Sequence, residues 1–118
     1  MSSPSDLVPN ADTAAEIVWD FVRGVPPGHV VTYGQIADMV AEVRVTARQV
    51  GGIMMTCPPD VPWHRVIGSG GFLPIAKRSP ELAMKQRELL TAEGVGLLSP
   101  QRVDLNRFRW MSFVEDEL

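Results

Sequence analysis

The chain has 118 residues, of which 45% are hydrophobic and 21% are charged, so we expect one globular domain and not a disordered chain. No apolar run approaches the roughly 18 residues of a membrane span, and the N-terminus lacks the pattern of a secretory signal. A single cysteine excludes an internal disulfide framework, and one cysteine with two histidines is too few for a Cys/His metal cluster. We therefore expect a cytoplasmic protein without a membrane anchor, a metal or a cofactor.

Basic residues gather in the middle of this chain, although its net charge is −3. Between Arg44 and Arg87 there are seven basic residues against two acidic ones, whereas residues 1–43 contain one arginine and six acids. A basic segment of this kind can bind phosphate locally while the whole molecule stays acidic. On charge alone, a chance fluctuation on a solvated face is an equal alternative.

The first predicted element is a helix that Asp12 caps and that runs to about Arg23. The Ser/Pro-rich residues 1–10 before it are predicted to be disordered, and residues 11–118 to form a single domain. Residues 24–28, with two prolines, end the helix. Its hydrophobic face is expected to consist of Ala14, Ile17, Val18 and Phe21.

Two short helices follow, and each begins with the pattern of a capping box. Thr32-x-x-Gln35 opens a helix over residues 33–41, and Thr46-x-x-Gln49 opens one over residues 47–55. Two such helices joined by a short turn are typical of a helix-turn-helix, whose second helix enters a DNA groove. A plain helical hairpin within a core is the alternative interpretation.

The second of these helices has features that favour contact with DNA. Arg48 and Gln49 lie at its N-terminal end, where side chains that read bases usually project. Gly51 and Gly52 are unusual inside a helix, because glycine costs about 1 kcal/mol there relative to alanine. Close approach of another backbone, such as a DNA strand, would explain them.

The segment Pro62–Ile67 combines features of a site. Pro62 stiffens the backbone, Trp63-His64-Arg65 presents an aromatic and two nitrogen-rich side chains, and Val66-Ile67 suits a buried strand before the glycine-rich turn over residues 68–71.

A last helix is predicted from the cap Ser79 to about Glu93, with Gly94 as its stop. Residues 95–98 and 103–105 are candidates for short strands. The remaining core contacts are expected from Leu82, Leu89 and Leu90 in the helix and from Trp110, Met111 and Phe113 near the C-terminus.

Four motifs resemble the C-terminal domain of the O6-alkylguanine-DNA alkyltransferases, over residues 14–95. They are Val31-Thr32-Tyr33-Gly34-Gln35-Ile36-Ala37, Ala47-Arg48-Gln49-Val50-Gly51-Gly52, Pro62-Trp63-His64-Arg65-Val66-Ile67 and Glu93-Gly94-Val95. The resemblance implies a mainly α fold with short β elements, a winged helix-turn-helix DNA-binding domain of the alkyltransferase C-terminal type. In the enzymes the residue between that proline and histidine is the acceptor cysteine, and here it is Trp63. This replacement is typical of the alkyltransferase-like proteins, which lack the acceptor.

The replacement predicts that the protein is not an enzyme, because alkyl transfer needs an activated thiolate and the indole nitrogen is only a donor. The resemblance maps a remnant of the family's Cys-His-Glu relay onto His64 and Glu93, which have no nucleophile to activate. Cys57 is expected to be a small packing residue. An active alkyltransferase that uses Cys57 is one alternative function.

The resemblance implies a DNA damage sensor that binds O6-alkylguanine in duplex DNA by nucleotide flipping and hands the lesion to nucleotide excision repair. Tyr33 would rotate the 3′ phosphate, Arg48 would fill the gap in the base stack, and Gln49, Gly51 and Gly52 would complete the DNA-binding face. The expected lesion pocket consists of Trp63, His64, Arg65, Gly68, Ser69 and Arg78, with Lys77 as the alternative to Arg78.

The implied partners are double-stranded DNA that contains the lesion and nucleotide excision repair proteins. We expect a monomer, cytoplasmic and associated with the nucleoid in a bacterium, or nuclear in a eukaryote. A winged-helix transcription regulator is the second alternative function. It predicts sequence preference in undamaged duplex and usually dimerisation, for which the sequence has no dedicated element.

Overall fold

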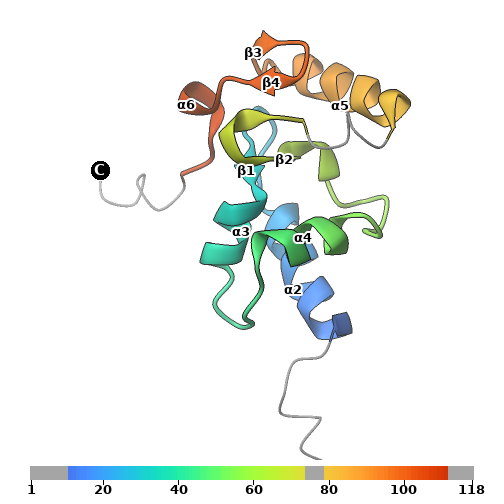
Figure 1. Cartoon of the computed structure of the whole chain (residues 1–118), viewed down its shortest axis with the longest axis vertical. Helices are drawn as coiled ribbons and strands as arrows, with labels where there is room; N and C mark the ends of the chain where they lie inside the picture. Colours follow the sequence, from blue (N-terminus) through green and yellow to red (C-terminus); the bar gives the residue numbers. More distant parts are fainter. Residues whose placement is uncertain (1–10, 74–78, 112–118) are drawn as a thin grey trace, which may run out of the picture.

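The structure is a computed structural model that describes residues 11–73 and 79–111. Helices dominate it and the strands are short, which confirms the predicted mainly α fold with short β elements (Figure 1). None of the helices in these two ranges is long and apolar enough to cross a membrane. In chain order the elements are α2 (Ala11–Arg23), β1 (Val31–Thr32), α3 (Tyr33–Met39), α4 (Ala47–Met54), the 3₁₀ helix η1 (Trp63–Arg65), β2 (Val66–Ile67), the 3₁₀ helix η2 (Ser69–Gly71), α5 (Pro80–Ala92), β3 (Leu97–Ser99), β4 (Arg102–Val103) and α6 (Leu105–Phe108).

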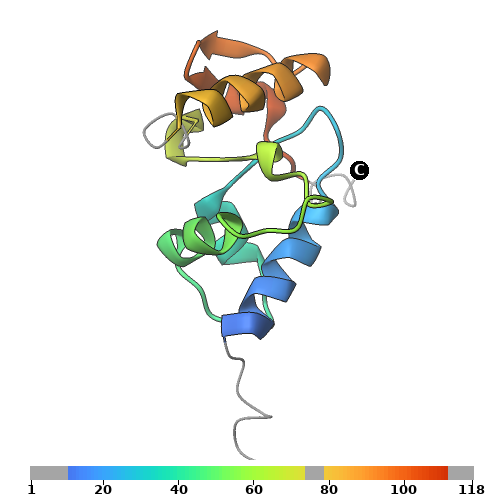
Figure 2. The same cartoon turned by 90° about the vertical axis from the view of Figure 1, so that its right-hand side faces the viewer.

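Helices α2, α3 and α4 pack together in the lower part of the molecule (Figures 1 and 2). Helix α2 turns the fully buried Val18 and Val22 toward this core. The indole Nε1 of Trp19 also donates a hydrogen bond to the Ile53 carbonyl oxygen of α4, at 3.2 Å. The helix begins at Ala11, two residues earlier than predicted, so Asp12 lies inside it and does not precede it as a cap.

Side-chain caps start both α3 and α4, as predicted. At α4 the capping box is complete, because the Thr46 hydroxyl accepts from the Gln49 N–H at 3.1 Å and the Gln49 side-chain oxygen accepts from the Thr46 N–H at 2.8 Å. At α3 the Thr32 hydroxyl accepts from the Gln35 N–H at 3.0 Å, but the Gln35 amide donates to the Trp110 carbonyl at 2.6 Å. Only half of that predicted box forms, because the C-terminal segment competes for the glutamine.

A two-stranded parallel pair joins the helical layer to the segment around Trp63. Strands β1 and β2 pair with Val31 opposite Val66 and Thr32 opposite Ile67, and all of these residues are buried. Strand β1 leads directly into α3, and η1 leads directly into β2. The pairing therefore fixes the start of α3 relative to Trp63.

Helix α5 and the β3–β4 hairpin enclose a second core in the upper part of the molecule (Figure 2). Helix α5 starts at the predicted cap, where the Ser79 hydroxyl accepts from the Leu82 N–H at 3.2 Å, and it ends before Gly94, whose φ of 84° favours glycine. The prediction of a core role for Leu82 is wrong, because this side chain is 46% exposed. The buried face of α5 contains Ala83, Gln86 and Leu90.

The C-terminal segment covers the first core. The ring of Trp110 lies 5.8 Å from that of Phe21, in a tilted arrangement, which confirms its predicted role. Met111 is 43% exposed and is not a core residue, and Phe113 lies outside the described residues. Helix α6 was not predicted, because a helix of four residues is too short to show a periodic pattern.

A carboxylate at the end of α5 connects the two parts of the molecule. The Glu93 side chain accepts hydrogen bonds from His64 Nε2 at 2.7 Å, from Arg65 Nε and Nη2 at 3.0 and 2.7 Å, and from the Gly28 N–H at 3.0 Å. Arg65 also donates to the Val25 carbonyl at 2.9 Å. One carboxylate thereby holds α5, η1 and the loop after α2 together.

These contacts determine the charge state of Glu93. Burial alone would raise the pKa of its carboxyl group, but the hydrogen bonds from Arg65, His64 and Gly28 outweigh burial and lower the pKa from 4.5 to about 2. The folded-state pKa therefore lies below the usual value, so Glu93 stabilises the fold fully above about pH 4.5. This stabilisation is lost as the pH falls from about 4.5 toward 2.

Replacing Glu93 with glutamine should lower the free energy of unfolding at pH 7 by about 3 kcal/mol, because the charged acceptor for Arg65 and His64 is lost. The deficit should shrink at pH 3, where the wild-type protein loses part of the same stabilisation. Urea unfolding at the two pH values measures both effects, and Glu88→Gln on the exposed face of α5 is the matched control. An equal deficit at both pH values would contradict the assigned role.

Candidate functional site

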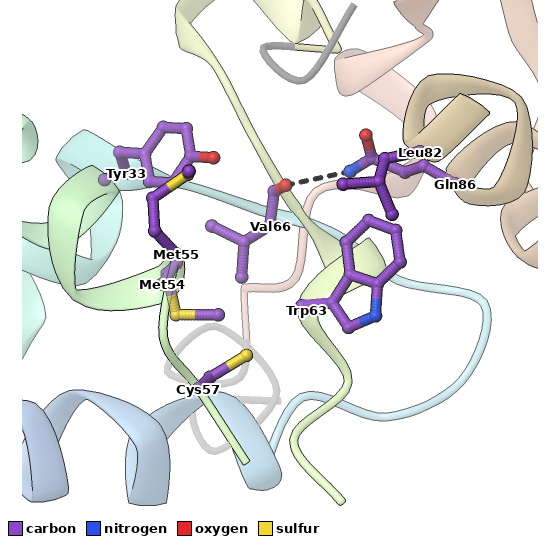
Figure 3. A pocket seen from close by; sticks show the side chains of 9 residues that line it. Tyr33, Met54, Met55, Cys57, Trp63, Val66, Leu82 and Gln86 are labelled. Carbon is purple, nitrogen blue, oxygen red and sulfur yellow. Dashed lines mark hydrogen bonds between the residues drawn. The ribbon is translucent and has the colours of Figure 1, made fainter. Parts of the chain in front are cut away.

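A pocket of about 220 Å³ opens between the helical layer and α5. In Figure 3, Tyr33, Met54 and Met55 form one side of it, Trp63 and Leu82 form the other, and Val66 lies between them. The first side comes from α3 and the end of α4, and the second from η1 and α5. The full lining consists of Tyr33, Gly51, Met54, Met55, Cys57, Trp63, Val66, Leu82 and Gln86.

The structure brings together two predicted site residues that are 30 positions apart, Tyr33 and Trp63. Tyr33 is the first residue of α3 and follows β1, whereas Trp63 starts η1 just before β2. The parallel pairing of β1 and β2 therefore places both rings on the same pocket. Both side chains also pack against the first core, so Trp63 is a pocket wall and a packing residue at once.

The predicted DNA-binding face lies on α4. Arg48 and Gln49 are exposed in its first turn, and the side-chain oxygen of Gln49 is used by the capping box. A Cβ atom added at Gly51 or Gly52 would meet nothing within 4 Å. Packing inside the described protein therefore does not require either glycine, and the helix surface there is flat and open.

The other predicted pocket residues do not line this cavity. His64 and Arg65 bind Glu93 behind it, and the ring of His64 meets that of Trp63 edge-on at 6.2 Å between centroids. Gly68 donates to the Phe72 carbonyl at 2.7 Å, and Ser69 is exposed in the following turn. Arg78 and its alternative Lys77 lie outside the described residues.

Cys57 lines the same pocket as Trp63. Burial raises the pKa of its thiol, which lowers the fraction of reactive thiolate at neutral pH. Its half-buried side chain packs against the first core, as expected for a small packing residue.

Gln86 is a pocket residue that sequence reasoning missed. Its amide nitrogen donates to the carbonyl oxygens of His64 at 3.2 Å and Val66 at 3.1 Å, and thereby fixes the backbone on both sides of Arg65. The signal was present, because a polar residue stands on the buried face of α5 between Ala83 and Leu90. Within residues 11–73 and 79–111, no three His, Cys, Asp or Glu side chains are grouped so as to hold a metal ion.

Comparison with known sequences identifies relatives over most of the chain. The family model described as "6-O-methylguanine DNA methyltransferase, DNA binding domain" matches residues 13–95. The DNA base-flipping protein of Escherichia coli K12 is 39% identical over 101 residues, which is 84% of this chain and 75% of that protein. Alkyltransferase-like protein 1 of Schizosaccharomyces pombe is 39% identical over 100 residues, which is 79% of this chain and 90% of that protein.

Solved structures show the same fold. S. pombe Atl1 in complex with damaged DNA containing O6-carboxymethylguanine matches with a TM-score of 0.72 and 36% identity, over 85% of this chain and 96% of that one. Mycobacterium tuberculosis OGT in complex with DNA matches with a TM-score of 0.56 and 31% identity, over 78% of this chain and 52% of that one. These matches confirm the predicted alkyltransferase C-terminal fold. The chain therefore belongs to the family of the 6-O-methylguanine DNA methyltransferase DNA-binding domain, and its relatives include alkyltransferase-like and base-flipping proteins.

Proposed function

We propose that this protein is a non-enzymatic sensor of DNA damage, which binds O6-alkylguanine in duplex DNA by nucleotide flipping and does not transfer the alkyl group. The observation that carries the proposal is the pocket between Tyr33 and Trp63, which adjoins the open face of α4. Its volume of about 220 Å³ is below the roughly 300–1,000 Å³ of pockets for drug-sized ligands, as expected for one nucleobase.

The open face of α4 supports an approach to DNA. Gly51 and Gly52 leave this helix without side chains where a DNA backbone would lie. Arg48 is exposed one turn away and can enter the base stack, where its planar cation can pair with the orphaned base and stack on its neighbours. Tyr33, at the start of α3, is the proposed residue that rotates the 3′ phosphate.

The pocket supports binding without transfer. Trp63 occupies the position at which the alkyltransferases have their acceptor cysteine, and an indole offers an aromatic surface but no thiolate. His64 and Glu93, the proposed remnant of the relay, bind each other at 2.7 Å and serve the packing of η1 on α5. Arg65 completes this brace, and either Arg78 or Lys77 is proposed to cover the flipped base.

A protein that binds a lesion without repairing it has to pass it on. The proposed partners are therefore nucleotide excision repair proteins. We propose that the protein acts as a monomer, in the cytoplasm or in the nucleus according to where the DNA lies. Alkyl transfer to Cys57 is the second candidate, because this thiol lines the same pocket. Its raised pKa favours the sensor.

Substitution of Gly52 by alanine should change folding and binding in opposite directions. Its Cβ has open space, so alanine should raise the free energy of unfolding by about 0.5–1 kcal/mol through helix propensity. The same methyl group should weaken DNA binding by holding α4 away from the backbone. Thr91→Ala, which raises helix propensity at an exposed position of α5, is the control that should leave DNA affinity unchanged. If Gly52→Ala binds DNA as tightly as the wild type, the DNA backbone does not approach α4 closely at Gly52.

Arg48→Ala should weaken binding to a duplex with one O6-methylguanine by about tenfold, because nothing then fills the gap left by the flipped nucleotide. The fold should be intact, since Arg48 is exposed. Arg107→Ala removes the same charge from the exposed side of α6 and should have a much smaller effect. Equal losses in the two variants, measured at one fixed salt concentration, would reduce Arg48 to a general electrostatic contact.

Trp63→Ala should bring the affinity ratio between O6-methylguanine and guanine duplexes toward one, because the aromatic wall of the pocket is removed. Trp63→Phe should keep most of the preference. The ratio of the two affinities is the appropriate readout, since a lower folded fraction affects both duplexes alike. A preference that survives in Trp63→Ala would mean that this side chain only fills the core.

A further inference from the structure

Gln86 of α5 holds the main chain of the segment that carries Trp63. Its amide nitrogen donates to two carbonyl oxygens, that of His64 at 3.2 Å and that of Val66 at 3.1 Å. The 3₁₀ helix η1 starts with Trp63 and leads directly into β2, and its N-terminal cap, Pro62, makes no side-chain hydrogen bond. Figure 3 shows Gln86 reaching from α5 to the Val66 carbonyl, on the same side of the pocket as Trp63. Gln86 therefore clamps η1 to α5 from the C-terminal side of this short helix.

The Glu93 carboxylate binds the same segment in a different way. It accepts from the side chains of His64 and Arg65, whereas Gln86 binds main-chain carbonyl groups only. A side chain can follow a small shift of its own main chain by rotating about its bonds. The Glu93 contacts therefore allow η1 to move slightly, and the Gln86 contacts do not.

The two donated hydrogen bonds explain why a glutamine stands at this position. Its side chain is 1% exposed, and the neighbours on the buried face of α5, Ala83 and Leu90, are apolar. The Oε1 atom is buried and has no hydrogen-bond partner within residues 11–73 and 79–111, which is unfavourable. Exchanging the amide oxygen and nitrogen would be worse, because the oxygen would then face two carbonyl oxygens. The benefit of the glutamine thus lies in its nitrogen, which holds η1.

We propose that Gln86 is a positioning residue for lesion recognition, which fixes the indole of Trp63 in the geometry that distinguishes alkylated guanine from guanine. This inference rests on the proposed function, in which Trp63 is the aromatic wall of the pocket. Gln86 acts through the main chain of η1 and not by contact with the base. A wall that is held in one place discriminates between similar bases better than a wall that can adapt to both.

The test replaces the clamp by an apolar side chain of similar length. Gln86→Met should lower the affinity ratio between O6-methylguanine and guanine duplexes about fivefold, because both bonds to η1 are lost. The ratio is the appropriate readout, since a lower folded fraction weakens binding to both duplexes alike. Gln86→Asn withdraws the amide by one methylene group and should show the same loss, so the test does not depend on the folding of one variant.

A second readout follows the position of the wall directly. The chain has three tryptophans, Trp19, Trp63 and Trp110, so protein labelled with 5-fluorotryptophan should give three fluorine NMR signals, and Trp63→Phe identifies that of Trp63. In Gln86→Met the Trp63 signal should shift or broaden, because the indole is no longer held in one place. The signals of Trp19 and Trp110, which lie in the first core, should stay as in the wild type.

Leu90→Val is the matched control, because Leu90 is fully buried on the same face of α5 and does not line the pocket. It should lower stability and leave both the affinity ratio and the Trp63 signal unchanged. A wild-type ratio in Gln86→Met and Gln86→Asn, an equal loss in Leu90→Val, or a reduced ratio with an unmoved Trp63 signal would each overturn the positioning role and leave the proposed function standing. A wild type that binds guanine and O6-methylguanine equally would overturn the proposed function, and the positioning role with it.

Discussion

The arrangement of the site depends on the hydrogen bonds that the Glu93 carboxylate accepts. This carboxylate accepts hydrogen bonds from η1 and from the loop after α2, while itself standing at the C-terminal cap of α5. Such a buried cluster keeps its stability only while all its partners are in place. Because η1 begins with Trp63, the cluster also determines how the aromatic wall of the pocket faces α4. The His–Glu pair of a catalytic relay would serve here as a structural brace.

The pocket is built by pieces that are distant in the sequence. The parallel pair β1–β2 brings Tyr33 and Trp63 to one cavity, and Gln86 of α5 fixes the carbonyls of His64 and Val66 at its back. Strands of two residues contribute few hydrogen bonds of their own. Their full burial and the Glu93 cluster therefore stabilise the pairing. A back wall fixed by these hydrogen bonds suits recognition of a flipped base.

The sequence predicted correctly those elements that depend on residues a few positions apart in the chain. The capping box of Thr46, the start of α5 at Ser79 and the anchor over Val66 and Ile67 appear in the structure as expected. The box at Thr32 formed only in part, because Trp110, far along the chain, takes the amide of Gln35. The α5 wall of the pocket was missed because Leu82 was expected in the core, although the helical spacing of Ala83, Gln86 and Leu90 marks the face that the structure buries. The resemblance supplied His64 and Glu93 as a pair, but the contributions of Arg65 and Gly28 depend on contacts that no motif encodes.

The most direct test of the central claim measures equilibrium binding of the wild-type protein to a short duplex with one O6-methylguanine and to its unmodified twin, at one fixed salt concentration. Intact-mass analysis of the protein then follows from the same mixture. A sensor should prefer the lesion duplex and keep its original mass. Equal affinity for both duplexes would contradict lesion recognition. A mass gain of one methyl group would show that Cys57 accepts the alkyl group and that the protein is an enzyme.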